Sequence, residues 1–483
     1  MKHIYVLILF LNSLFLIAQT QIGSTLYGTA NVEMSGESIS MSNNGNRIAV
    51  GTPFNNDQGS HKGNIKIYDW INGNWALTGN IYGPNNSYLS NNVHLSENGN
   101  TFIVTTSDFV STANTNICIY ELQNGVWTMT WNLTSAVNSN VGYSASISGD
   151  GNTFAYTDYN LGSDQMSLGK VYIVRKINNT WTEIGVINEN SLNIGYGNGF
   201  GRTTKLSPDG NKLFVSAPGK GTLHSFQYEN GQWVQYGGTI LETNNSAGHF
   251  GESFSLNSNS DLIAIGNNFY NRTTTNNGAV TFYSLINGLW TKVGQITGAP
   301  DAMIGKHVSI SDNNLVAISS IKNNLNQSIS GSLLVYKIDL ANQIYTQLGN
   351  TVNAGYNDFM IVNEISKTSN KVMTSAHSAD SPNNTRAGYV KVFGYDSFLN
   401  TTEIDNKKNL NIYPSPTKGK IYFDGLENKI NSVKVFNTSQ QLIMEKAVQS
   451  NDKNIDIPHI AGIYFVVFYL KDSTTLTKKI IIE

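Results

Sequence analysis

Few residues of this 483-residue chain stand in a pattern that could perform chemistry. The sequence has no His-Glu-x-x-His metal motif, no Gly-x-Ser-x-Gly nucleophile turn and no glycine-rich phosphate loop. The one cysteine, Cys118, excludes an internal disulfide and any metal site built from cysteine pairs. It lies in an apolar, strand-like stretch, so we expect a small core residue. We therefore expect no catalytic residues, no metal and no cofactor.

The net charge of the chain limits the kinds of molecule that the protein can bind. The formal net charge is -2, and only five arginines occur in the chain. Nucleic-acid binders need a strongly basic surface, so that class is excluded. Carboxylates from distant segments can still meet in a folded chain, and a polysaccharide hydrolase or lyase therefore stays open as an alternative.

Candidate binding residues occur in segments that vary between otherwise similar repeats. A rigid scaffold usually carries its function on such segments. Tyrosine and arginine are frequent in binding hot spots, and aromatic faces suit sugar rings. The candidates for a face that binds a glycan or a protein are Tyr159, Tyr196, Phe269, Tyr270, Arg272 and His377.

The repeat itself has two markers. The first is a polar turn followed by an aromatic residue, as in Asn72-Gly73-Asn74-Trp75, and it recurs every 52 to 57 residues. Asn-Gly between apolar residues predicts a two-residue hairpin turn, because both positions tolerate positive φ. The second marker, typified by Ile147-Ser148-Gly149-Asp150-Gly151-Asn152, occurs in seven copies. Two hairpins in each repeat predict four strands.

Seven units of four strands predict an all-β, seven-bladed β-propeller over residues 19–396. A linear solenoid is the rival, but the last repeat lacks its fourth strand. Ile22–Leu26 is similar to Leu348–Val352, the fourth strand of repeat six. We expect Ile22–Leu26 to pair with Tyr389–Phe393 and to close the ring. The repeated tryptophans at 75, 127, 181, 233 and 290 are expected to pack between blades rather than to bind sugars.

The repeats resemble FG-GAP-like propellers. The resemblance rests on Phe200-Gly201, Phe250-Gly251, the Ser-x-Asp-Gly-Asn turns and the Gly-x-Val-x-x-Tyr third strands, and it covers about residues 22–396. It implies a fold, not a reaction. The acidic calcium loops of some relatives have no counterpart here, so the resemblance implies no calcium site.

The two ends of the chain differ from the repeats. Lys2 and an apolar run up to Ile17 predict a secretory signal peptide over residues 1–18. Residues 397–408 are polar and are expected to form a linker. No later segment is long enough for a transmembrane helix in the mature protein. The final segment, 409–483, contains short alternating strands that predict a small Ig-like β-sandwich.

This final segment resembles the type A C-terminal sorting domain of the type IX secretion system. The resemblance is carried by the residues Tyr413, Pro414, Pro416, Gly419, Gly462, Tyr464, Lys478 and Lys479. Ser415 stands where that family usually has Asn. The resemblance implies contact with the type IX machinery, passage through the periplasm, a Bacteroidota source, and a protein that is shed or attached to surface lipopolysaccharide.

These observations lead to three hypotheses. The first is an exported binding or adhesion propeller with a glycan or protein ligand. The second is the polysaccharide-active enzyme, which requires two carboxylates in one pocket. The third is a structural component of the envelope or matrix without a discrete ligand.

Overall fold

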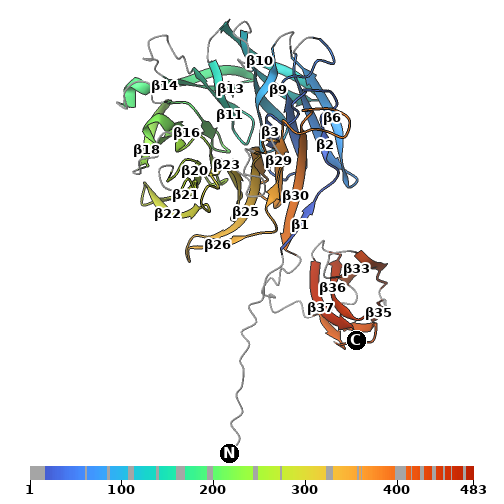
Figure 1. The fold of residues 1–483 in the computed structure, drawn as a ribbon. Helices are drawn as coiled ribbons and strands as arrows, with labels where there is room; N and C mark the ends of the chain where they lie inside the picture. The colour runs from blue at the N-terminus through green and yellow to red at the C-terminus, as the bar shows by residue number, and fades with distance from the viewer. Residues whose placement is uncertain are drawn as a thin grey trace, which may run out of the picture. The chain divides into compact units, whose positions relative to one another are not determined.

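The computed structural model describes residues 17–482 except 60–61, 84–86, 107–113, 138–140, 159–168, 193–198, 243–248, 272–274, 322–329, 356–357, 361, 398–409, 415, 425–428, 438–441, 450–451, 458–459 and 472–474. It divides into two compact units, Gln19–Tyr395 and a second unit that contains Asp396–Glu483 (Figure 1). Within the described residues, no helix has the length and apolar character needed to cross a membrane. The predicted signal peptide lies mostly outside the described residues.

The larger unit is all-β and consists of consecutive groups of antiparallel strands. Group 1 contains β3 (Ile39–Met41), β4 (Arg47–Thr52), β5 (Asn64–Ile71) and β6 (Asn74–Tyr82). Group 2 contains β7 (Leu89–Leu95), β8 (Thr101–Thr106), β9 (Asn114–Gln123) and β10 (Val126–Val137). Group 3 contains β11 (Val141–Ile147), β12 (Thr153–Asp158), β13 (Lys170–Ile177) and β14 (Thr180–Asn188).

The later groups repeat this arrangement. Group 4 contains β15 (Thr204–Leu206), β16 (Lys212–Ala217), β17 (Thr222–Glu229) and β18 (Gln232–Leu241). Group 5 contains β19 (Phe254–Leu256), β20 (Leu262–Asn267), β21 (Ala279–Ile286) and β22 (Leu289–Thr297). Group 6 contains β23 (Ile304–Ile310), β24 (Leu315–Ser320), β25 (Ser332–Asp339), β26 (Ile344–Gln347) and β27 (Val352–Asn353). Group 7 contains β28 (Val362–Ile365), β29 (Lys371–Ala376) and β30 (Tyr389–Ser397).

The hairpin turns follow the Asn-Gly prediction. Asn72 and Gly73 have φ values of 51° and 81°, and Asn230 and Gly231 repeat them at 51° and 81°. Two successive positive φ values are the requirement of a type I′ turn. Local sequence therefore fixes where the third strand of each of these groups ends and the fourth begins.

The amino-terminal segment completes group 7, as the sequence predicts. β1 (Ile17–Gln21) and β2 (Leu26–Tyr27) both pair with β30 (Figure 1). Leu26 lies opposite Val390, and the Ile22 amide donates to the Val392 carbonyl oxygen at 2.8 Å. The unit is therefore closed by hydrogen bonds between the two ends of its own chain, and the amino-terminal segment supplies the outer strand of group 7.

The innermost strands of the groups lie around a common central axis. β7 contacts β3 and β11, β23 contacts β19 and β28, and β28 contacts β3. The innermost strands start at one end of this axis, which we call the loop end, and finish at the other, which we call the turn end. The loop end carries the connections between groups, and the turn end carries the turns of the second sequence marker.

The aromatic marker residues pack between groups, and this prediction is confirmed. Most of the rings cover a glycine of the preceding group: Trp127 covers Gly79, Trp233 covers Gly185, Trp290 covers Gly237 and Tyr345 covers Gly294. Trp181 instead donates from Nε1 to Thr130 Oγ1 at 3.3 Å. A glycine is needed under a ring because any side chain there would overlap the indole.

The smaller unit is also built of strands. One sheet contains β31 (Asn411–Tyr413), β32 (Lys420–Asp424) and β35 (Asn454–Asp456). The other contains β34 (Leu442–Ala447), β33 (Ile430–Asn437), β36 (Gly462–Leu470) and β37 (Thr475–Ile482). Both sheets contribute to one apolar core, in which Phe423 packs edge-on against Phe468 at 5.5 Å.

Candidate functional site

Charged and aromatic residues lie at the loop end of the innermost strands. A glycine with positive φ lies within three residues of the start of the innermost strand in five groups, at Gly36, Gly142, Gly201, Gly251 and Gly305. The residue that follows each glycine differs from group to group. These five residues, which we call the mouth ring, are Glu37, Tyr143, Arg202, Glu252 and Lys306.

Three basic side chains lie close to the carboxylate of Glu252. Its Oε1 lies 3.0 Å from His249 Nδ1, a contact without hydrogen-bond geometry, and 3.9 Å from Arg202 Nη2. Its Oε2 accepts a hydrogen bond from Lys306 Nζ at 3.2 Å. Burial alone would raise the pKa of Glu252, but the charges of Lys306, His249 and Arg202 lower it below its usual value. The carboxylate is therefore ionised at neutral pH.

The basic groups of this cluster stay accessible, unlike the carboxylate. The side chains of Arg202 and Lys306 are 35% and 33% exposed, whereas Glu252 is 15% exposed. The Arg202 guanidinium also lies 4.6 Å from the centre of the Tyr143 ring, and Tyr143 is 37% exposed. This arrangement offers a ligand two positive groups and an aromatic edge, while the less exposed Glu252 carboxylate orients the positive groups.

Of the predicted binding residues, His377 lies beside a mouth-ring residue, and Phe269 lies beside His249, which contacts the mouth-ring residue Glu252. Phe269 packs on His249 with ring centres 4.1 Å apart, and Tyr270 follows it in the connection after β20. His377 follows β29; its Nδ1 lies 3.4 Å from Glu37 Oε2, and its ring stacks with Phe359. These residues come from groups 5 and 7. The other three predicted residues, Tyr159, Tyr196 and Arg272, lie outside the described residues.

Sequence reasoning missed the mouth ring. Arg202, Glu252 and Lys306 are about 50 residues apart in the chain, so no local pattern joins them. The available signal was the residue after each repeated glycine. The type of this residue changes from repeat to repeat although the fold around it is the same. Repeat proteins usually carry their binding residues at such positions.

No metal site accompanies these groups in the described part of the chain. None of its clusters contains three His, Cys, Asp or Glu side chains that could hold a metal ion. Cys118 is buried, and burial raises the pKa of its thiol to about 11. The thiol is therefore protonated at neutral pH and is a poor nucleophile.

In the smaller unit, the three separate parts of the sorting motif meet at one end. Gly462 begins β36 and pairs with Ile482 of the tail strand, on which Lys478 and Lys479 also lie. The Thr417 amide, between Pro416 and Gly419, donates to the Ile481 carbonyl oxygen at 2.8 Å. Tyr464 is buried and donates from its hydroxyl to the Ile460 carbonyl oxygen.

The first part of the motif stays at the surface. Tyr413, at the end of β31, is 50% exposed and stacks on Tyr422. The adjoining Pro414 and Pro416 are exposed too. At this end of the unit, hydrogen bonds hold the backbone in place, while aromatic and proline side chains are exposed on the surface.

Several solved structures are similar to the chain at low sequence identity. A periplasmic gluconolactonase of Pseudomonas aeruginosa has 16% identity and a TM-score of 0.44; the match covers 66% of this chain and 86% of that one. A protein of Lactobacillus plantarum has 15% identity and a TM-score of 0.43, with 66% and 85% covered. TolB of Acinetobacter baumannii has 14% identity and a TM-score of 0.38, with 65% of each chain covered. Such identities are too low for these names to say anything of this chain's activity.

No curated protein matches the chain. Residues 411–483, however, match the family model described as a secretion system C-terminal sorting domain. The matched range contains every residue on which the type IX resemblance rests. The chain therefore ends in a type IX secretion sorting domain, which indicates that the protein is secreted or carried on the outer cell surface.

Proposed function

We propose that this protein is an exported binding protein. Its larger unit, 19–396, is a seven-bladed propeller of the FG-GAP-like kind in which groups 1 to 7 are the blades. A signal peptide, 1–18, precedes it, and a linker, 397–408, leads to an Ig-like sandwich, 409–483. The propeller carries the ligand site, and the sandwich directs export.

The ligand that best fits the loop end is an acidic glycan. The observation that carries this proposal is the exposure of Arg202 and Lys306, which both contact the less exposed Glu252 carboxylate. A planar guanidinium binds a carboxylate or sulfate through two hydrogen bonds. The exposed part of the Tyr143 ring can pack against a sugar ring. A protein ligand with an acidic segment would use the same charges.

The variable connections around the mouth ring complete this proposed site. Phe269 and Tyr270 adjoin the Glu252 cluster, and His377 adjoins Glu37. We place Tyr159, Tyr196 and Arg272 in the same site because they belong to connections at the same end of the repeats. An adhesion role follows if the protein stays on the outer surface.

The test is binding of purified protein to an array of acidic and neutral glycans, followed by calorimetry on any glycan retained. Arg202→Met is expected to weaken binding about tenfold or more, because a charge-assisted pair is lost. Lys292→Met is the matched control, since Lys292 is an exposed cation on the outer strand β22, outside the connections of the proposed site. Equal loss in both variants, or retention of neutral glycans only, would exclude this site. If no glycan binds, an acidic protein segment or a purely structural role takes its place.

A second candidate function is supported at the turn end. Glu97 and Glu364 both line a pocket there, and two carboxyl groups in one pocket are what glycoside hydrolysis requires. Burial raises the pKa of both side chains, as a general acid needs. Release of reducing sugar from a polysaccharide, and its loss in Glu97→Gln and Glu364→Gln, would establish an enzyme. Activity that survives both changes would exclude these residues.

A further inference from the structure

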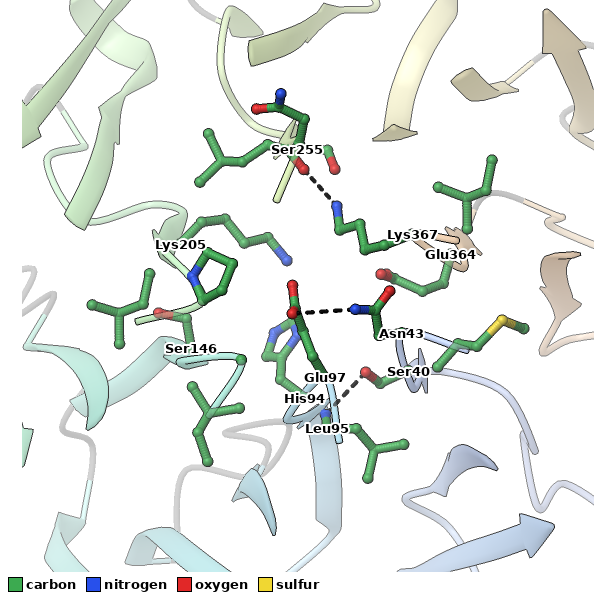
Figure 2. Close-up of a pocket in the computed structure, with 18 residues that line it drawn as sticks. Ser40, Asn43, His94, Leu95, Glu97, Ser146, Lys205, Ser255, Glu364 and Lys367 are labelled. Atoms are coloured by element: carbon green, nitrogen blue, oxygen red, sulfur yellow. Dashed lines mark hydrogen bonds between the residues drawn. The ribbon is translucent and has the colours of Figure 1, made fainter. Parts of the chain in front are cut away.

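A pocket of about 110 Å³ lies at the turn end of the innermost strands. Figure 2 shows this pocket encircled by strands of different groups, whose side chains point toward its centre. A single bound water needs only about 10–15 Å³, so this space admits a small molecule. The lining comes from groups 1 to 5 and group 7, and no residue of the mouth ring contributes to it.

The rim of this pocket is fixed by backbone hydrogen bonds between neighbouring groups. The Asn43 amide donates to the Glu97 carbonyl oxygen at 2.8 Å, and the Glu97 amide donates to the Gly149 carbonyl oxygen at 2.9 Å. Across the ring, the Asp312 amide donates to the Lys367 carbonyl oxygen at 3.0 Å. Side chains that project from this rim are therefore held in place before any ligand arrives.

The pocket presents hydrogen-bonding groups of both kinds. Lys205 extends its ammonium group toward the centre (Figure 2), and among the described residues it has no hydrogen-bond or ion-pair partner. Glu97 accepts one long bond from Asn43 Nδ2, at 3.4 Å, and the carboxyl group of Glu364 also faces the pocket. Lys367 differs, because its ammonium group already donates to the Leu256 and Ile310 carbonyl oxygens. Donors at Lys205 and acceptors at Glu97 and Glu364 are thus available together.

The pocket is lined by two acidic side chains, Glu97 and Glu364, and two basic ones, Lys205 and Lys367, so their formal charges balance. Burial raises the pKa of Glu364 and of Glu97, and burial lowers the pKa of Lys367. Burial also holds His94 neutral, with a pKa well below its usual value. A free anion would be repelled by the two carboxylates, and a free cation by the two ammonium groups. A ligand without net charge avoids both costs.

We propose that this pocket binds a neutral, hydroxyl-rich molecule, either a free monosaccharide or the terminal sugar of a glycan. A hydroxyl group both donates and accepts, so neighbouring hydroxyls of one ring can satisfy Lys205 and Glu364 together. Aliphatic side chains complete the lining and suit the C–H faces of a sugar: Met41, Leu95, Ile147, Leu206, Leu256 and Ile365. This site is distinct from the loop end and does not depend on an acidic ligand there.

The test is calorimetry of the full mature chain with glycerol, glucose, galactose, mannose and N-acetylglucosamine, each also offered as a short oligosaccharide. Lys205→Met is expected to weaken binding about tenfold, because a charged hydrogen bond is lost. Glu364→Gln is expected to weaken it as well, while Arg202→Met and Lys220→Met leave it unchanged. Tighter binding of the oligosaccharide identifies a glycan end as the ligand, and equal binding identifies a free sugar.

Three outcomes would overturn the proposal. They are no binding of any of these probes, tighter binding of acetate or phosphate than of sugars, and sugar binding that Lys205→Met leaves unchanged. Circular dichroism and the melting temperature show whether each variant is folded. Lys205→Gln, which keeps a neutral donor of similar length, is expected to fall between the wild type and Lys205→Met, so a folding defect in one variant leaves the proposal falsifiable.

Discussion

The indole nitrogen of Trp75 donates a hydrogen bond to the carbonyl oxygen of Ile22, 3.0 Å away, across the seam where the two ends of the larger unit meet. Trp75 belongs to group 1, and Ile22 belongs to the strand segment added to group 7. The neighbouring Gly23 lies under the same indole, just as Gly79 lies under Trp127 inside the chain. The seam therefore uses the same contact as the internal junctions between groups.

A side chain on Gly23 should open this seam. A Cβ there would lie 2.8 Å from Trp75 Cδ1, and the φ of Gly23 is +72°. Gly23→Ala is expected to lower the free energy of unfolding by about 2–4 kcal/mol, from strain in the backbone and overlap with the ring. Gly73→Ala is the matched control, because its φ is +81° and nothing lies within 4 Å of the added carbon. The control should lose only about 1 kcal/mol. Equal losses in urea unfolding would mean that the Trp75 contact does not hold the seam.

A basic residue makes a second contact across this seam. Lys371, at the start of β29, donates from Nζ to the Gly45 carbonyl oxygen at 3.0 Å and to Asn46 Oδ1 at 2.8 Å. Arg47 makes the equivalent contact from group 1 to group 2, donating to the Gly99 carbonyl oxygen at 2.9 Å. Lys371→Met should therefore destabilise the unit by about 1–3 kcal/mol.

Arg47→Met should destabilise the unit at least as much as Lys371→Met, because Arg47 also donates to Asp69 at 2.6 Å and 2.9 Å. Lys220→Met serves as the control in chemical unfolding, and a variant at either bridge that is no less stable than this control would contradict the prediction.

The closure could be predicted because each of the two sequence patterns behind it lies within one short segment of the chain. The similarity of Ile22–Leu26 to Leu348–Val352 identified a missing strand, and its observed partner is β30, as expected. The patterns did not predict the mouth ring or the charges at the turn end. Arg202 meets Glu252 only after groups 4 and 5 have packed together, and Lys205 faces Glu364 only after groups 4 and 7 have come to lie around one centre. Such neighbours are set by the order of repeats around a circle, and no single repeat contains that information.

A buried histidine should make stability depend on pH. His224 in β17 is 1% exposed, its Nε2 lies 3.1 Å from Thr222 Oγ1, and burial lowers its pKa to about 4. The unfolded chain therefore binds a proton at His224 near pH 6.5, whereas the folded chain does so only near pH 4. Stability contributed by the neutral ring is full above pH 6.5 and is lost as the pH falls toward 4, by roughly 3 kcal/mol. Between pH 7 and pH 4, the free energy of unfolding of His224→Gln should therefore fall by about this amount less than that of the wild type. An unchanged slope would show that other groups cause the acid sensitivity.

Export should depend on the smaller unit, while folding of the larger unit should not. The closure contacts of Ile22, Gly23 and Trp75 all lie within Gln19–Tyr395, so removal of 411–483 leaves them intact. In a host with type IX secretion, the deletion variant is expected to accumulate in the periplasm as a folded, protease-resistant protein, as fractionation and immunoblotting would show. Phe468→Ala should reduce export as well, because loss of this fully buried ring costs about 3–5 kcal/mol in a small core. Val126→Ala, which changes an exposed residue of group 2, is the control and should be exported normally. If the deletion variant reached the medium as efficiently as the full chain, residues 411–483 would not be the export signal.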